Sequence, residues 1–251
     1  DATWTEEDVF DGYYLLVKDI DMDASIFNTS ATIKNPMSCG SANFKNMGLT
    51  GTFDGNGYTI KNLHLRGITS VGLFAAINGG TLKNVSISDD TGYKDGYWGG
   101  PYLSAMIRGA KFENVHIYTG KTRWYASDFT LSKYIIDSTF VNCVFDSPAL
   151  NYYHGLANYI TGSMFTNCYY ISAQSVYTAN GATAVTYEAS NCKPTGDLTG
   201  TEYESTIWLD GIKRYASAAA MIADKANNDY SSFSATYWDV TSGMPVWKAK
   251  N

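Results

Sequence analysis

The amino-acid sequence predicts an all-β protein, a right-handed parallel β-helix (a solenoid) of roughly six to eight coils with a cap at each end. Three observations support this prediction. A phrase of the form apolar–x–Asn–apolar–x–apolar recurs along the chain, and apolar and polar residues alternate around each of its asparagines. The composition, with 20 tyrosines, 23 glycines and only 5 prolines in 251 residues, favours short strands and turns over long helices.

The recurring phrase is clearest in "YTIKNLHL", "GTLKNVSI", "AKFENVHI", "STFVNCVF" and "SMFTNCYY". Its asparagines are Asn62, Asn84, Asn114, Asn142 and Asn167, which are spaced 22, 30, 28 and 25 residues apart, and Asn191 is a sixth candidate 24 residues later. Repeats of roughly 20 to 30 residues are typical of solenoids, in which each unit buries its apolar face against its neighbours. Successive phrases are therefore expected to lie on successive coils.

The alternation within each phrase indicates a short strand with one buried face. Around Asn62, for example, the apolar residues are Ile60, Leu63 and Leu65, and polar residues stand between them. An asparagine between two such strands fits a turn, because asparagine tolerates unusual backbone angles and its amide can bond to the next coil. With coils about 4.8 Å apart, these amides would form a ladder, so we interpret the asparagines as structural and not catalytic.

Two stretches resemble the GLUG-type repeats of bacterial cell-surface proteins. They are "LTGTFDGNGYTIKNLHL" (49–65) and "VGLFAAINGGTLKNVSI" (71–87). "GYYLLVKDIDMDAS" (12–25) is similar to the opening strand of that family, and "YWDVTSGMPVWK" (237–248) to its closing segment. The resemblance implies a β-helix and a secreted or surface-anchored bacterial protein.

The chain is expected to form a single domain over residues 1–251, because both ends of a solenoid must be sealed. Residues 1–48 are expected to supply the N-terminal strand and cap, 49–195 the repeat coils, and 196–251 the C-terminal cap. Within that cap, the Ala-rich stretch "RYASAAAMIADKANND" (214–229) is a candidate for a short helix.

The four cysteines are Cys39, Cys143, Cys168 and Cys192, and the last three each follow an asparagine of the repeat. We expect these three to stack inward as small buried apolar residues. Disulfides are a weaker alternative, because side chains in register on parallel strands point the same way. A zinc site would need paired C-x-x-C cysteines or nearby histidines, which the sequence does not offer, and no cofactor is predicted.

Charge and hydropathy exclude several classes of partner. The formal net charge of −6 argues against nucleic acid or an anionic membrane as a partner. The sequence contains no run of about 18 apolar residues, so no membrane span is predicted. Asp19, Asp21 and Asp23 share one face of an expected strand, yet the sequence around them does not match an EF-hand calcium loop. We interpret them as the solvated face of that strand.

Outward positions of the repeat strands offer a weak case for catalysis. Ser86, His116 and Asp146 suggest a triad, although stacked strands bring such combinations together by coincidence. The paired carboxylates of glycoside hydrolases are missing from this ladder. No catalytic residue and no metal site is predicted.

The loops that return from one coil to the next carry most of the candidate ligand-binding residues, and His116, at an outward position of a repeat strand, is the other candidate. The loop residues are Tyr93, Tyr97, Trp98, Tyr118, Trp124, Tyr125, Tyr152, Tyr153 and His154. Loops on one edge of a solenoid form a continuous surface, and exposed aromatic rings suit sugar rings or protein partners. Alternatively, the rings fold back as a secondary core over the sheet.

These observations predict a non-catalytic, adhesin-like module that binds a glycan or a surface protein through its aromatic loops, and the resemblance implies that the module is secreted or lies at the cell surface. A structural stalk or spacer is the first alternative, and a polysaccharide lyase or glycoside hydrolase is the weaker one. The sequence leaves the oligomeric state open.

Overall fold

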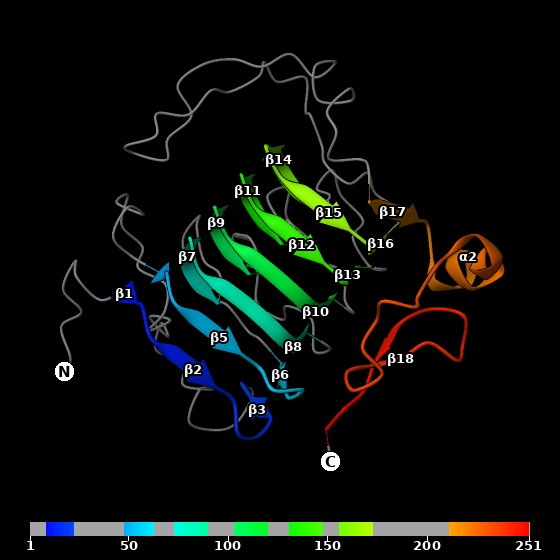
Figure 1. The fold of residues 1–251 in the computed structure, drawn as a ribbon, viewed down its shortest axis with the longest axis horizontal. Coiled ribbons are helices and arrows are strands. Elements are labelled where there is room, and N and C mark those ends of the chain that lie inside the picture. The colour runs from blue at the N-terminus through cyan, green and yellow to red at the C-terminus, as the bar shows by residue number, and fades with distance from the viewer. Residues whose placement is uncertain are drawn as a thin grey trace, which may run out of the picture.

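The structure of the protein is a computed structural model that describes residues 9–22, 48–62, 73–89, 103–119, 131–147, 156–172 and 211–250. These residues form mostly strands, with one short α-helix and one 3-10 turn. Strands from successive repeats lie side by side and run parallel, and among the described strands only the last two form an antiparallel pair (Figure 1). The prediction of an all-β protein built from parallel strands is therefore confirmed. No described helix is long and apolar enough to cross a membrane.

One sheet contains six strands, one from each successive repeat. Its order is β1 (Val9–Phe10), β4 (Gly48–Leu49), β7 (Phe74–Asn78), β9 (Ser104–Arg108), β11 (Ser132–Ile136) and β14 (Ala157–Thr161). Leu49, Ile77, Ile107, Ile135 and Ile160 stand in register across the last five strands and are all buried.

The second sheet contains eleven strands arranged in two rows. The first row is made of β2 (Tyr13–Leu15), β5 (Thr52–Asp54), residues 81–83 of β8 (Thr81–Asp89), residues 111–113 of β10 (Lys111–Thr119), β12 (Thr139–Val141) and β15 (Met164–Thr166). The second row is made of β3 (Ile20–Asp21), β6 (Thr59–Lys61), the later parts of β8 and β10, β13 (Val144–Asp146), β16 (Cys168–Ile171) and β17 (Ile212–Tyr215).

Asparagines form the bend between the two rows. Asn56, Asn84, Asn114, Asn142 and Asn167 stand there, with φ between 51° and 54°. This left-handed region is costly for most residues, but asparagine adopts it readily because its short polar side chain can bond locally. The prediction of structural turn asparagines is confirmed for Asn84, Asn114, Asn142 and Asn167. It is wrong about the place of Asn62, which has a φ of 57° but follows β6 at the end of the second row, so Asn56 takes the equivalent place in that repeat. Asn191 lies outside the described residues.

A second bend separates the six-stranded sheet from the first row. Gly79, Gly109, Asp137 and Gly162 occupy equivalent places there, with φ between 47° and 77°. In sequence, these are the small or polar residues that end each apolar run. Asp137 shows that an L-residue is accepted at this bend.

Stacked aromatic rings fill the core behind the first row. Phe112, Phe140 and Phe165 are in register, and their ring centroids lie 4.5 Å and 4.7 Å apart with nearly parallel planes. The spacing matches the distance between neighbouring strands, so in-register phenylalanines stack without strain.

Cys143 and Cys168 are free thiols buried in the same core. Burial raises the pKa of the Cys143 thiol well above its ordinary value. The two residues therefore act as small apolar groups, as predicted. Cys39 and Cys192 lie outside the described residues.

The C-terminal segment, residues 216–250, contains α2 (Ala218–Ala223), the 3-10 turn η2 (Lys225–Asn227), β18 (Trp238–Asp239) and β19 (Val246–Trp247). α2 lies within the Ala-rich stretch 214–229 and begins after Ser217, whose side chain accepts a hydrogen bond from the Ala220 N–H. The segment starts beside β17 and then returns along the second row (Figure 1). It covers the side of the sheet as well as its end, which the sequence did not indicate.

Candidate functional site

The two rows of the eleven-stranded sheet have different outer surfaces. On the outer side of the second row, Val144, Tyr169 and Ile171 are buried against an aromatic cluster of the C-terminal segment that includes Phe233 and Trp238. We call this surface the covered face. We call the outer side of the first row the open face. Its residues alternate along each strand with the buried ones, and some of them are exposed apolar side chains.

The predicted ligand-binding residues divide between described and undescribed parts of the chain. His116 and Tyr118 lie on β10, and the sheet places them on the covered face. The other eight lie outside the described residues: Tyr93, Tyr97, Trp98, Trp124, Tyr125, Tyr152, Tyr153 and His154. The geometry of the aromatic loops therefore remains a prediction.

His116 is enclosed by residues that are distant in sequence. Its Nδ1 lies 3.0 Å from the Ser86 Oγ, and its ring packs edge-on against Trp238 and parallel to Trp247, with centroids 5.9 Å and 6.4 Å away. Burial lowers the pKa of the imidazole to about 4, although part of the residue remains exposed. The ring is therefore neutral at pH 7, and it serves as a packing partner for the C-terminal tryptophans.

Asp146 does not complete a catalytic triad with Ser86 and His116. It is in register with Tyr118, two residues beyond the level of His116. Burial raises the pKa of its carboxyl group to about 6, and its Oδ1 is a buried atom with no hydrogen-bond partner. The Ser86 Oγ and the His116 Nδ1 are in contact. However, Ser86 is buried, and the His116 ring is packed against Trp238 and Trp247 of the C-terminal segment.

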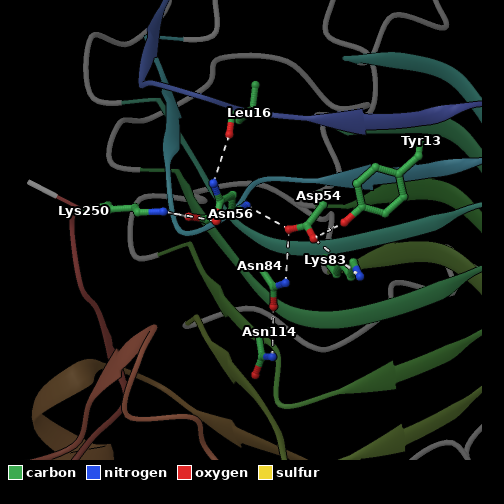
Figure 2. Close-up of polar contacts among 8 residues, drawn as sticks. All are labelled: Tyr13, Leu16, Asp54, Asn56, Lys83, Asn84, Asn114 and Lys250. Atoms are coloured by element: carbon green, nitrogen blue, oxygen red, sulfur yellow. Dashed lines mark hydrogen bonds and ion pairs between the residues drawn. The ribbon is translucent and has the colours of Figure 1, made fainter.

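On the open face, Asp54 is the centre of a polar cluster that sequence reasoning missed (Figure 2). Its Oδ2 accepts a 2.6 Å hydrogen bond from the Tyr13 hydroxyl and lies 3.4 Å from the Lys83 Nζ. Its Oδ1 accepts hydrogen bonds from the backbone N–H of Asn56 at 2.8 Å and from the Asn84 Nδ2 at 3.1 Å. Asp54 itself is buried, so strands β2, β5 and β8 are joined through one carboxylate.

The electrostatics of this cluster agree with its geometry. Burial of Asp54 would raise its pKa, but hydrogen bonds from Tyr13, Asn56 and Asn84 and the charge of Lys83 lower the pKa below its usual value. The hydrogen bond to Asp54 raises the pKa of Tyr13. Partial burial opposes the effect of Asp54 on Lys83, yet the pKa of the ammonium group is raised overall. All three residues keep their ordinary protonation states at neutral pH.

The C-terminal segment is also attached to the first repeat. The Lys250 Nζ donates to the carbonyl oxygen and to the Oδ1 of Asn56, at 3.0 Å and 3.1 Å (Figure 2). The same ammonium group lies 4.7 Å from the centroid of the Tyr58 ring. The segment thus runs from β17 at one end of the sheet back to the turn after β5.

Two of the three aspartates in "DIDMD" have structural roles. The Asp19 Oδ1 accepts a hydrogen bond from the Thr59 N–H, and the Asp21 Oδ1 accepts one from the Asn62 Nδ2, both at 2.8 Å. Asp23 lies outside the described residues. In the part of the chain that the structure describes, no three His, Cys, Asp or Glu side chains are placed to hold a metal ion.

Comparison with protein-family models, with curated protein sequences and with solved structures finds no match to this chain. The class defined by the fold is an all-β protein with stacked parallel strands, and its function has to be argued from its own surfaces.

Proposed function

We propose that the chain is a non-catalytic, secreted or cell-surface module, adhesin-like, that binds a glycan or a protein. Its proposed fold is a right-handed parallel β-helix of roughly six to eight coils, of the GLUG type suggested by residues 49–87. Parallel strands from successive repeats and the left-handed asparagines between them support this fold.

The observation that carries the function is the contrast between the two outer surfaces. The covered face buries its apolar side chains under the C-terminal segment, whereas the open face exposes Tyr13, Leu15, Val141 and Met164. Tyr13 is 61% exposed and Met164 is 62% exposed. These side chains form two pairs, Tyr13 with Leu15 on β2 and Val141 with Met164 on the neighbouring strands β12 and β15, and exposed apolar side chains grouped in this way mark interaction surfaces.

Two further features support binding over catalysis. His116 and Asp146, whose pKa values are strongly shifted, are mostly buried on the second row. A lyase or hydrolase of polysaccharides would need its acid or base to reach the substrate. On the open face, Tyr13, Asp54 and Lys83 keep their ordinary protonation states, and hydrogen bonds and an ion pair hold their side chains in place.

A structural stalk is the second candidate, and the core favours it. The stacked rings of Phe112, Phe140 and Phe165 continue from strand to strand with constant spacing. Such a core would suit a rigid spacer even if no ligand were bound.

A binding screen of the purified 251-residue chain tests the proposal. The chain would be applied to arrays of plant, microbial and mucin glycans and used to capture proteins of host surfaces. We expect a reproducible ligand whose binding is lost in the double variant Leu15→Asp, Val141→Asp, which changes both ends of the open face, and kept in Ile222→Asp, since Ile222 is exposed on α2 in the C-terminal segment.

Two other outcomes have clear meanings. Loss of binding only in Trp98→Ala and Trp124→Ala would assign the site to the aromatic loops and keep the function. Failure to bind any glycan or protein would contradict the proposal and favour the stalk.

A further inference from the structure

We propose that Tyr13 is the stacking platform of a binding site for an uncharged pyranose ring of a glycan, with Thr52, Thr81 and Lys83 beside it. This inference rests on the proposed binding function and assigns its ligand class and position. It follows from how Tyr13 is held, what surrounds it and how the local charges balance.

Tyr13 combines exposure with a fixed orientation. Its side chain is mostly open to solvent, yet its hydroxyl group is bound to Asp54 and the Lys83 Nζ lies 5.5 Å from its ring centroid. An exposed tyrosine without such contacts would rotate freely and would lose that freedom on binding. A ring that is already ordered avoids this loss of entropy, so stacking on it costs less.

The anchor of the ring is rigid as well. Asp54 is buried and accepts hydrogen bonds from Asn56 and Asn84, and Asn84 in turn accepts one from Asn114 (Figure 2). The platform is therefore connected to the hydrogen-bonded bend between the two rows.

Hydroxyl groups lie next to the platform in the order of the strands. Tyr13 is in register with Thr52 on β5, and Thr52 is in register with Thr81 on β8. Neighbouring strands are about 4.8 Å apart, so the backbones of Thr52 and Thr81 lie about 5 Å and about 10 Å from the backbone of Tyr13. A pyranose ring has an apolar face of C–H groups and a rim of hydroxyl groups. The Tyr13 ring can pack against the C–H face, and the threonine hydroxyl groups can form hydrogen bonds with the rim.

The charges around the site favour an uncharged ligand. Asp54 and Lys83 form an ion pair at 3.4 Å, and on β10 the exposed residues Lys111 and Glu113 again bring one charge of each sign. An acidic sugar would gain from Lys83 and Lys111 but would be repelled by Asp54 and Glu113. The balance leaves hydrogen bonding and stacking as the main sources of affinity.

The test measures the affinity of the complete chain for defined oligosaccharides by calorimetry. The probes are uncharged hexasaccharides of glucose, mannose, xylose and N-acetylglucosamine, with a hexasaccharide of galacturonic acid as the acidic comparison. We expect an uncharged probe to bind, and Tyr13→Ala to weaken it by roughly tenfold or more. Tyr13→Phe keeps the ring but loses its anchor, so it should weaken binding less. Val246→Ser, an exposed substitution on β19, should leave the affinity unchanged.

Each remaining outcome overturns the inference in a distinguishable way. Binding of an uncharged probe that Tyr13→Ala leaves intact would disprove the site and keep the proposed function. Binding of the acidic probe alone would disprove the ligand class. Capture of a protein that depends on Leu15, shown by Leu15→Ser, and not on Tyr13 would replace the glycan by a protein partner. Absence of any glycan or protein ligand would reject both the inference and the proposed function. The melting temperature of each variant shows whether it is folded.

Discussion

The side-chain amide of Asn114 donates a hydrogen bond to the Oδ1 of Asn84 across 3.2 Å, although 30 residues separate them in sequence. Asn84 makes the equivalent bond to Asp54 at 3.1 Å, so one polar chain follows the bend across three repeats. Beyond Asn114 the pattern changes, because Asn142 and Asn167 donate to Ser232 of the C-terminal segment. The Asn114 Oδ1 is consequently buried without a partner. The polar chain thus ends at Asn114, and the next two asparagines are bound instead by a segment distant in sequence.

Substitution at Asn114 should separate its two structural contributions. Asn114→Ala places a Cβ-bearing residue without a polar side chain at φ 52° and also removes the bond to Asn84. The expected loss in the free energy of unfolding is about 2 kcal/mol. Asn114→Gly loses the same bond but accepts the backbone angle, so it should be more stable than the alanine variant by about 1 kcal/mol. Urea unfolding of both variants measures the difference, and equal stabilities would show that the backbone angle is unimportant.

The stacked rings should dominate the stability of the first row. Phe140 is fully buried between Phe112 and Phe165, so Phe140→Ala is expected to cost about 3 to 5 kcal/mol. Met164 precedes Phe165 on β15 but points outward, and Met164→Ala should change stability by less than about 0.5 kcal/mol. Similar costs for the two substitutions in urea unfolding would contradict the assignment of inner and outer faces.

His116 and Asp146 should make opposite contributions to the dependence of stability on pH. The pKa of His116 is lowered from 6.5 to about 4 in the folded protein, so its contribution is present above pH 6.5 and is lost as pH falls toward 4. The pKa of Asp146 is raised from 3.8 to about 6, so its contribution is present below pH 3.8 and is lost as pH rises through 6. Between pH 4 and 6.5 the two effects offset each other.

Single variants should separate the two opposing effects of pH on the free energy of unfolding. Between pH 6.5 and 4.5, Asp146→Asn should lose about 2 kcal/mol more stability than the wild type, because only the His116 effect remains. His116→Gln should gain about 2 kcal/mol relative to the wild type over the same interval. Urea unfolding at the two pH values is the measurement. Parallel pH profiles for all three proteins would show that neither group is buried as described.

The tryptophans of the C-terminal segment should control the ionisation of His116. Trp247→Ala removes the ring that lies parallel to the imidazole and admits water to it. The pKa of His116 is then expected to rise from about 4 toward 6.5, as followed by NMR titration of the imidazole protons. The exposed substitution Val246→Ala on the same strand provides the control, and an unchanged pKa in Trp247→Ala would mean that other residues exclude the water.

The repeated features were the ones that sequence reasoning could predict. Asparagine in a recurring phrase indicated a left-handed bend at Asn84, Asn114, Asn142 and Asn167, and alternation around it separated inward from outward residues. The same phrase around Asn62 misplaced the bend of its repeat, which is at Asn56. Because every repeat faces the same geometric requirement, each copy supports the interpretation of the others.

Features that occur once could not be predicted in the same way. The C-terminal segment has no repeat, so nothing in its composition showed that Trp238 and Trp247 would pack on His116. Alternation places Tyr13 and Lys83 on an outer face, but it does not show that both bind Asp54, which follows Tyr13 by 41 residues. Such contacts depend on which repeats become neighbours and on the rotamers of long side chains.

The central claim is that the open face, and not the covered face, binds a ligand, and side-chain footprinting tests it most directly. The chain would be labelled by hydroxyl radicals with and without the ligand found in the binding screen, and labelling would be quantified by mass spectrometry. Tyr13, Leu15, Val141 and Met164 are exposed on the open face, whereas Ile222 and Val246 are exposed on the C-terminal segment. The account predicts that the ligand protects Tyr13 and Leu15 and leaves Ile222 and Val246 unchanged. Unchanged labelling across the open face, with protection confined to the C-terminal segment or the aromatic loops, would contradict it.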